Sequence, residues 1–131
     1  MKTHAFRLKQ GADLRKSIED YTIKNGIKAG VVLSGVGALT KVELRNAGAT
    51  KVITLEEHFE IVSITGTLSQ DESHIHISVA DENLRTYGGH MKTGCIVGVT
   101  AEIVLLEMTD VEFRREVDDT DYECLAIHDL N

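Results

Sequence analysis

The chain has 131 residues, 42% of them hydrophobic, which favours a single domain over residues 1–131 with a core of its own. Its formal net charge of −7 argues against a nucleic-acid surface, because such surfaces are built from clustered Lys and Arg. No apolar run is long enough to cross a membrane, and residues 1–10 lack the apolar core of a secretion signal, so we expect a cytoplasmic protein.

The chain begins with the pattern of a strand followed by a helix. Lys2–Lys9 alternates loosely between polar and apolar residues, as a half-buried strand does. Asp13 is a suitable N-cap for a helix whose apolar positions, Leu14, Ile18 and Tyr21, recur at helical spacing. Asn25-Gly26 is typical of a helix end. The opposite side of this helix is charged, so we expect it to cover a sheet.

A glycine-containing apolar segment comes next. Val31–Leu39 carries Gly35 and Gly37 but does not complete a phosphate-binding motif, so it predicts a buried strand with a bulge or close packing. Lys41–Arg45 alternates and is expected to pair with it. Residues 46–49 have the composition of a turn.

Glu57–Leu68 predicts a long strand, and residues 69–72 then turn the chain into the next strand as an antiparallel hairpin. Strand alternation places Glu60 with Val62 and Ile64 on one face. Two interpretations of Glu60 stay open. It is either a buried acid with a raised pKa, and so a candidate catalytic acid, or an exposed side chain at the wet end of the strand.

The stretch from His74 to His90 carries the candidate chemistry. In His74–Ala80 the alternation is that of a strand, so His74 and His76 point to the same face while the apolar residues between them face the core. A third imidazole, His90, follows Gly88-Gly89, a pair that lets the backbone either turn sharply or approach another element closely. Three imidazoles suit a transition metal such as zinc and leave one coordination position open. The alternative is that the two strand histidines are simply solvated.

The rest of the chain adds further strands. Gly94–Glu107 predicts one long strand, or two with a bend at Gly98, and Val111–Glu116 and Tyr122–Ile127 predict two shorter ones around an acidic turn. The segment between Asp81 and Tyr87 is a further candidate for helix. One helix and about seven strands, mostly linked as hairpins, indicate an α+β fold with a mostly antiparallel, strongly curved sheet.

The ordered set of motifs resembles the plants and prokaryotes conserved (PPC or PCC) domain family over nearly the whole chain. The most specific part is His74-Ile75-His76 with Ala80-Asp81, followed by Gly88-Gly89-His90. The supporting parts are Arg7-Leu8, Gly11, Asp13-Leu14, Gly35-Val36-Gly37-Ala38-Leu39, Phe59-Glu60-Ile61, Gly66-Thr67, Gly94 and Thr100-Ala101-Glu102-Ile103.

The resemblance implies an α+β fold similar to that of acetolactate decarboxylases, assembled as a homotrimer. It also implies a histidine cluster that holds zinc, with His74, His76 and His90 as the metal ligands. Plant members of the family are linked to DNA binding through a separate AT-hook with an Arg-Gly-Arg-Pro core. This sequence contains no proline, so the hook is absent and direct DNA binding by the domain is doubtful. Glu82-Asn83 stands where the family commonly has a glycine.

Two functions follow as expectations. The first is a homotrimeric binding or assembly module with a zinc or small-ligand site, acting with DNA-binding partners as the resemblance implies. The second is a zinc-dependent lyase or decarboxylase acting on a small carbonyl-containing acid, in which the metal polarises a carbonyl. That chemistry needs a proton donor, for which Glu60 is the candidate, and a cation to anchor the substrate, for which Arg7, Arg45 and Arg85 are open. Convergence of an arginine and a buried carboxylate on the histidines would discriminate the two.

Overall fold

The computed structural model describes residues 1–131 as one helix and nine strands. The N-terminal elements are β1 (Lys2–Lys9) and α1 (Leu14–Lys24). The remaining strands are β2 (Gly30–Arg45), β3 (Val52–Leu55), β4 (Phe59–Leu68), β5 (His74–Ala80), β6 (Thr86–Met91), β7 (Ile96–Glu107), β8 (Val111–Val117) and β9 (Glu123–Asp129). The predicted α+β class is confirmed.

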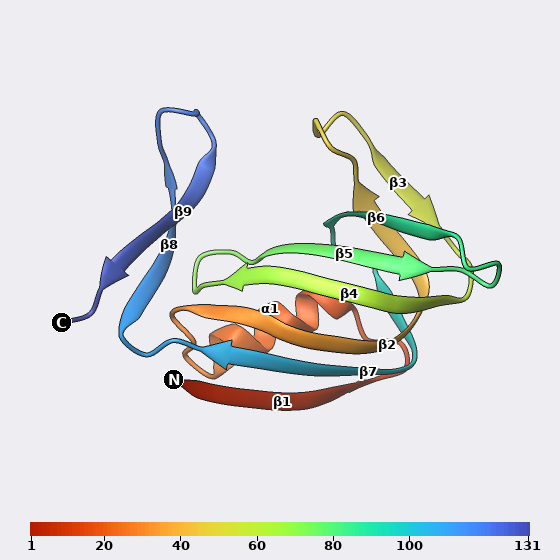
Figure 1. Cartoon of the computed structure of the whole chain (residues 1–131), viewed down its shortest axis with the longest axis horizontal. Helices are drawn as coiled ribbons and strands as arrows, with labels where there is room; N and C mark the ends of the chain where they lie inside the picture. Colours follow the sequence, from red (N-terminus) through yellow and green to blue (C-terminus); the bar gives the residue numbers. More distant parts are fainter.

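The helix forms where the sequence predicts it. The Asp13 carboxylate accepts the backbone N–H of Lys16 over 3.0 Å, which satisfies one of the free N–H groups of the first turn. Gly26, with φ of 62°, lets the chain reverse after the last turn. Leu14 and Ile18 are fully buried, so α1 packs its apolar side against one face of the sheet (Figure 1).

Seven strands form one antiparallel sheet in the order β1-β7-β2-β4-β5-β6, with β3 added beside β2. The predicted hairpin of β4 and β5 is confirmed by their register, in which Ile64 faces Ile77. The apolar core lies between this sheet and α1 and includes Phe59, Ile103 and Leu105. Cys95, expected to be a small core residue, is also fully buried.

Strand β2 corrects one prediction. Val31–Leu39 and Lys41–Arg45 do not pair with each other, because both belong to this single sixteen-residue strand. Shifts of register with β7 around Leu39 bend β2 without ending it, and no turn residue interrupts it there. Its first part pairs with β7 and β4, and its last part pairs with β3 and β6. The sheet is therefore curved back on itself, since β6 is bonded to both β5 and β2.

Three further details bear on the sequence-based predictions. No helix forms between Asp81 and Tyr87; the Asp81 carboxylate instead accepts the backbone N–H groups of Asn83 and Arg85 and fixes a turn. Of the two alternatives for Gly88-Gly89, the turn is not found, because the pair is part of β6, where Gly89 approaches the backbone of Arg45 closely. The short strand β3 was not predicted from the sequence. Its partner is the end of β2, which was predicted to pair with Val31–Leu39 instead.

The two last strands form a separate hairpin, which we call the C-terminal arm (Val111–Asp129). β8 and β9 pair only with each other, and the arm stands beside the main sheet at the end of the molecule where both termini lie (Figure 1). It is attached by the backbone N–H of Phe113, which donates to the carbonyl of Lys28 over 2.9 Å, and by the buried Phe113 ring.

The helix of this chain is neither long nor apolar enough to cross a bilayer.

Candidate metal centre

The three candidate ligands meet on the outer surface of the sheet. Within β5, Ile75, Ile77 and Val79 are buried while His74 and His76 are exposed, as strand alternation predicts. His90 on β6 is the register partner of His76. Residues directly opposite on antiparallel strands lie on the same face, so the glycine pair brings His90 to the cluster through a strand rather than a turn.

The geometry of the cluster suits one metal ion. The ring centroids of His74 and His76 lie 4.9 Å apart, and that of His90 lies 5.3 and 5.6 Å from theirs. One nitrogen from each ring can be chosen so that all three lie within 4.8 Å of one another. Tetrahedral zinc separates its ligand nitrogens by about 3.4 Å, so the exposed rings of His74 and His76 would rotate to reach this spacing on binding the ion.

The protonation of these rings also fits metal binding. Burial, followed by the charges of Arg45 and Arg15, lowers the pKa of His90 to about 4. Burial and then the charge of Arg115 lower the pKa of His74. Neutral imidazole is the form that donates a lone pair to a metal. The Nδ1 atom of His90 is buried without a hydrogen-bond partner, so an unused donor atom is already in place.

Arg45 is one of the three arginines that the sequence offers as a substrate-anchoring cation. It is the one of the three that lies beside the histidine cluster. Arg45 is the register partner of His90 on β2, so Thr65, His76, His90 and Arg45 form one row across four strands. Two adjoining pockets, of about 540 and 530 Å³, share Arg45, His74, His90 and Tyr122 as wall residues. The other two open arginines lie elsewhere, since Arg7 donates to Thr100 and Arg85 pairs with Asp81.

Two more arginines surround the cluster and were not singled out from the sequence. Arg15 on α1 is buried, donates to the carbonyl of Met91 over 2.9 Å, and is paired with Glu19 and Glu72. Arg115 on the arm lines the same pocket as His74 and His90. Only the tertiary placement of the arm brings Arg115 there, so no local pattern in the sequence signals it.

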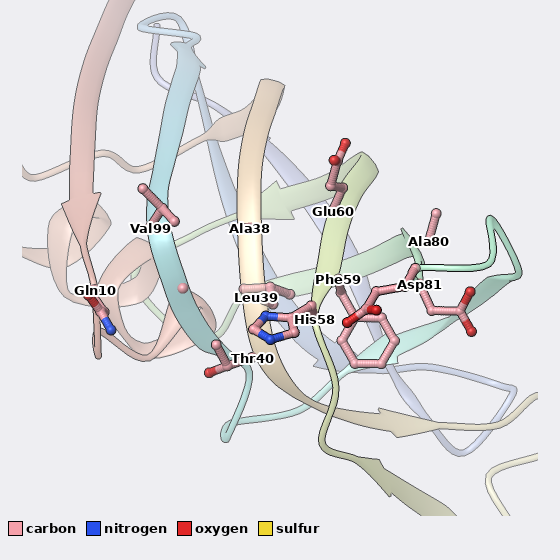
Figure 2. A pocket seen from close by; sticks show the side chains of 12 residues that line it. Gln10, Ala38, Leu39, Thr40, His58, Phe59, Glu60, Ala80, Asp81 and Val99 are labelled. Atoms are coloured by element: carbon pink, nitrogen blue, oxygen red, sulfur yellow. The ribbon is translucent and has the colours of Figure 1, made fainter.

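Glu60 lies away from the histidines. Thr65 is the β4 residue opposite His76, and Glu60 precedes it by five positions, about 16 Å along a strand. Glu60 is exposed and lines a different cavity of about 340 Å³ together with His58 and Asp81, as Figure 2 shows. The bulge between Ile61 and Ser63 reverses the alternation, which is why Ile64 is buried while Glu60 and Val62 are not.

The fold and the site define a class: an α+β domain whose curved antiparallel sheet carries a three-imidazole cluster on its outer surface. The family profile of the Plants and Prokaryotes Conserved (PCC) domain matches residues 1–109. The chain belongs to this family, as the sequence motifs indicate. The C-terminal arm lies outside the matched range, so the prediction of one domain over residues 1–131 stays a prediction.

Among curated proteins, the chain is 39% identical over 118 residues to the bifunctional protein GlmU of Synechococcus sp. (strain JA-3-3Ab), covering 90% of this chain and 19% of that protein. It is 28% identical over 113 residues to AT-hook motif nuclear-localized protein 13 of Arabidopsis thaliana, covering 78% of this chain and 26% of that protein. The chain thus spans about a fifth to a quarter of the length of these relatives.

Solved structures share the whole fold. A hypothetical protein from Salmonella superposes with a TM-score of 0.96 at 31% identity, covering 99% of this chain and 95% of that one. A plant- and prokaryote-conserved protein from Pyrococcus horikoshii gives 0.81 at 25% identity, covering 96% and 92%. A metal-containing protein from Archaeoglobus fulgidus gives 0.76 at 24% identity, covering 96% and 94%.

Proposed function

We propose that the protein is a metal-dependent binding module in which His74, His76 and His90 hold a zinc ion. The observation that carries this proposal is the convergence of three ring nitrogens within 4.8 Å. Three protein ligands would leave a fourth position for a ligand, and His74 and His90 line the same pockets as Arg45 and Tyr122. The Archaeoglobus relative described as metal-containing adds support from the same fold.

The module is proposed to work as a homotrimer. Four large apolar side chains, Leu33, Val36, Val62 and Val99, are 55–74% exposed. They lie on β2, β4 and β7, which are neighbours in the sheet. An apolar group of this kind on adjacent strands normally marks an interface, and a further copy of the chain is the occupant that the family resemblance implies. Association with a DNA-bound partner, as the name of the Arabidopsis relative suggests, would then be a property of a larger assembly.

A second candidate function is a zinc-dependent lyase or decarboxylase. The presence of Arg45 beside His90 favours it, because such an enzyme needs a cation to anchor its substrate. The carboxylates that line the histidine pockets are Glu72 and Glu123. The Glu72 side chain is 56% exposed and Glu123 is exposed, so neither is a buried acid. With no such acid at the metal, ligand binding is the better-supported function.

Metal content tests the proposal directly. Protein carrying no affinity tag and purified without added metal is analysed by mass spectrometry for bound metals and then titrated with zinc. We expect about one zinc per chain in the wild type and a large loss in His76→Asn. His58→Asn, which alters an exposed histidine of the other cavity, is the matched control. Equal zinc binding by His76→Asn and the wild type would refute the proposed function.

A further inference from the structure

We propose that the zinc site takes a small organic acid whose carboxylate lies between Arg45 and Arg115 while a second oxygen of the same molecule reaches the metal. This inference rests on the proposed function and extends it to the chemical class of the ligand. It also assigns a role to the C-terminal arm, which supplies Arg115 and lies beyond the residues matched by the family profile.

The Arg45 guanidinium has no anionic partner within the chain. Its Nε atom is buried and makes no hydrogen bond, and no carboxylate lies within ion-pair distance of its guanidinium. A buried donor without a partner costs free energy, and more so when the group is charged. Its register partner is the ligand candidate His90, so an anion that satisfied Arg45 would lie next to the metal.

Arg115 is held in position but is not neutralised. Its Nη2 atom donates to Thr67 Oγ1 over 2.7 Å, and its backbone N–H donates to the Asp71 carboxylate over 2.9 Å. Thr67 is the register partner of His74, which places the guanidinium beside the cluster. The contrast with Arg114 is informative, because that neighbouring guanidinium pairs with Asp71 at 3.1 Å and Glu112 at 3.8 Å. Although carboxylates outnumber basic side chains in this chain, none of them forms an ion pair with the Arg115 guanidinium.

The two guanidiniums belong to one pocket. Arg45, Arg115, His74 and His90 all line the cavity of about 530 Å³, a size typical of small-molecule sites. Arg115 is bonded to Thr67, the register partner of His74, and Arg45 is the register partner of His90, so both cations lie beside the proposed metal ligands. The wall also contains Thr120 and Tyr122 of the arm, whose hydroxyl groups can bond to a polar ligand. A third cation, Lys92, and the exposed carboxylates of Glu72 and Glu123 line it as well.

A carboxylate fits this pocket better than a phosphate does. The planar guanidinium fork binds both carboxylate and phosphate through two parallel hydrogen bonds, so the rest of the wall decides between them. Phosphate sites in proteins are commonly built on a helix N-terminus or a run of backbone N–H groups. The N-terminus of α1 is not part of this wall, whose residues come from strands, the arm, the turn before β5 and the loop after β6.

Calorimetry on the zinc-loaded full-length protein tests the inference. Oxalate, which has a carboxylate and a second oxygen donor, is the probe, acetate is the single-donor comparison, and inorganic phosphate is the competing class. We expect oxalate to bind more tightly than either. Arg45→Gln, Arg45→Lys and Arg115→Gln should each lower oxalate affinity about tenfold or more, the loss expected for charge-assisted hydrogen bonds, while Arg7→Gln leaves it unchanged.

Zinc content, measured on the same samples after titration, separates the two proposals. If the wild type holds no zinc, the proposed function fails. If zinc is retained and the three arginine variants bind oxalate as tightly as the wild type, the carboxylate inference is wrong. Tighter binding of phosphate than of oxalate would also overturn it. Arg45→Lys keeps the positive charge, so a loss of affinity in this variant with normal zinc content and thermal unfolding assigns the effect to the guanidinium fork.

Discussion

Arg45 and His90 are register partners across the antiparallel pairing of β2 with β6. This pairing joins the end of the longest strand to the strand that carries the third candidate ligand. The metal cluster and the unpaired guanidinium therefore share one backbone framework, and any change that separates β2 from β6 should affect both.

Gly89 is the position at which this framework is most sensitive. A Cβ atom added there would lie 2.8 Å from the carbonyl oxygen of Arg45, too close for the two strands to keep their spacing. We expect Gly89→Ala to lower the free energy of unfolding by about 1–3 kcal/mol, as overpacking does, and to weaken zinc binding. Urea unfolding and zinc titration measure the two effects.

Gly98→Ala is the control for that variant, since its added Cβ would meet nothing nearer than 3.4 Å. Equal stability and equal zinc affinity in the two variants would contradict the importance of the β2–β6 contact.

The stability of the metal-free protein should depend on pH through His90. Its pKa in the folded protein is about 4, below the ordinary value of 6.5, and that of His74 is lowered as well. Between these two pH values the unfolded chain binds a proton at His90 that the folded chain does not, so acid favours unfolding. We expect stability in the presence of a chelator to fall as the pH drops from about 6.5 to about 4.

The measurement is the urea midpoint at several pH values, compared between the wild type and His90→Asn. Other groups titrate in the same range, so the difference between the two proteins is the informative quantity. A shallower pH dependence in His90→Asn supports the prediction, and identical slopes refute it. His58→Asn should behave like the wild type.

Association through the exposed apolar side chains should give a trimer. Light scattering at micromolar concentration is expected to give three times the 14.4 kDa mass of the chain. A carboxylate at the centre of an apolar interface is costly to bury, so Val36→Glu combined with Val62→Glu should shift the mass towards the monomer. Ile23→Glu, an exposed position on α1, is the control. A wild-type mass near 14.4 kDa would exclude the trimer.

Direct binding to duplex DNA should be weak or absent. A net charge of −7 opposes the approach of a polyanion, and the cations around the histidines line pockets of small-molecule size. Titration of labelled duplex at about 150 mM salt should show no binding in the micromolar range. Micromolar binding that weakens steeply with added salt would reveal a basic surface assembled by the trimer.

Most of the fold followed from local sequence patterns. The cap at Asp13, the apolar spacing of α1 and the alternation of β5 are short-range signals, and each was read correctly. Strand alternation also placed His74 and His76 together. The bulge that reverses alternation in β4 has no such signal, which is why Glu60 and Ile64 were wrongly placed on one face.

The rest of the site depends on pairings between distant segments. Gly88-Gly89 is compatible with a turn or with close approach to another element, and only the pairing with the end of β2 shows that Gly89 serves close approach. The placement of Arg45 follows from that pairing, and the placement of Arg115 follows from the docking of the arm. Neither contact leaves a periodic pattern along the chain, so neither was predictable from one sequence.

The sixteen-residue β2 has a consequence for how the protein acquires its structure. Its early residues pair with β7 and its last ones with β6, partners that are synthesised long after it. Such non-local contacts slow folding, because the chain between the partners must be ordered before they meet. We therefore expect the histidine cluster to form late in refolding. The time at which zinc affinity appears would then report when the native strand pairing is complete.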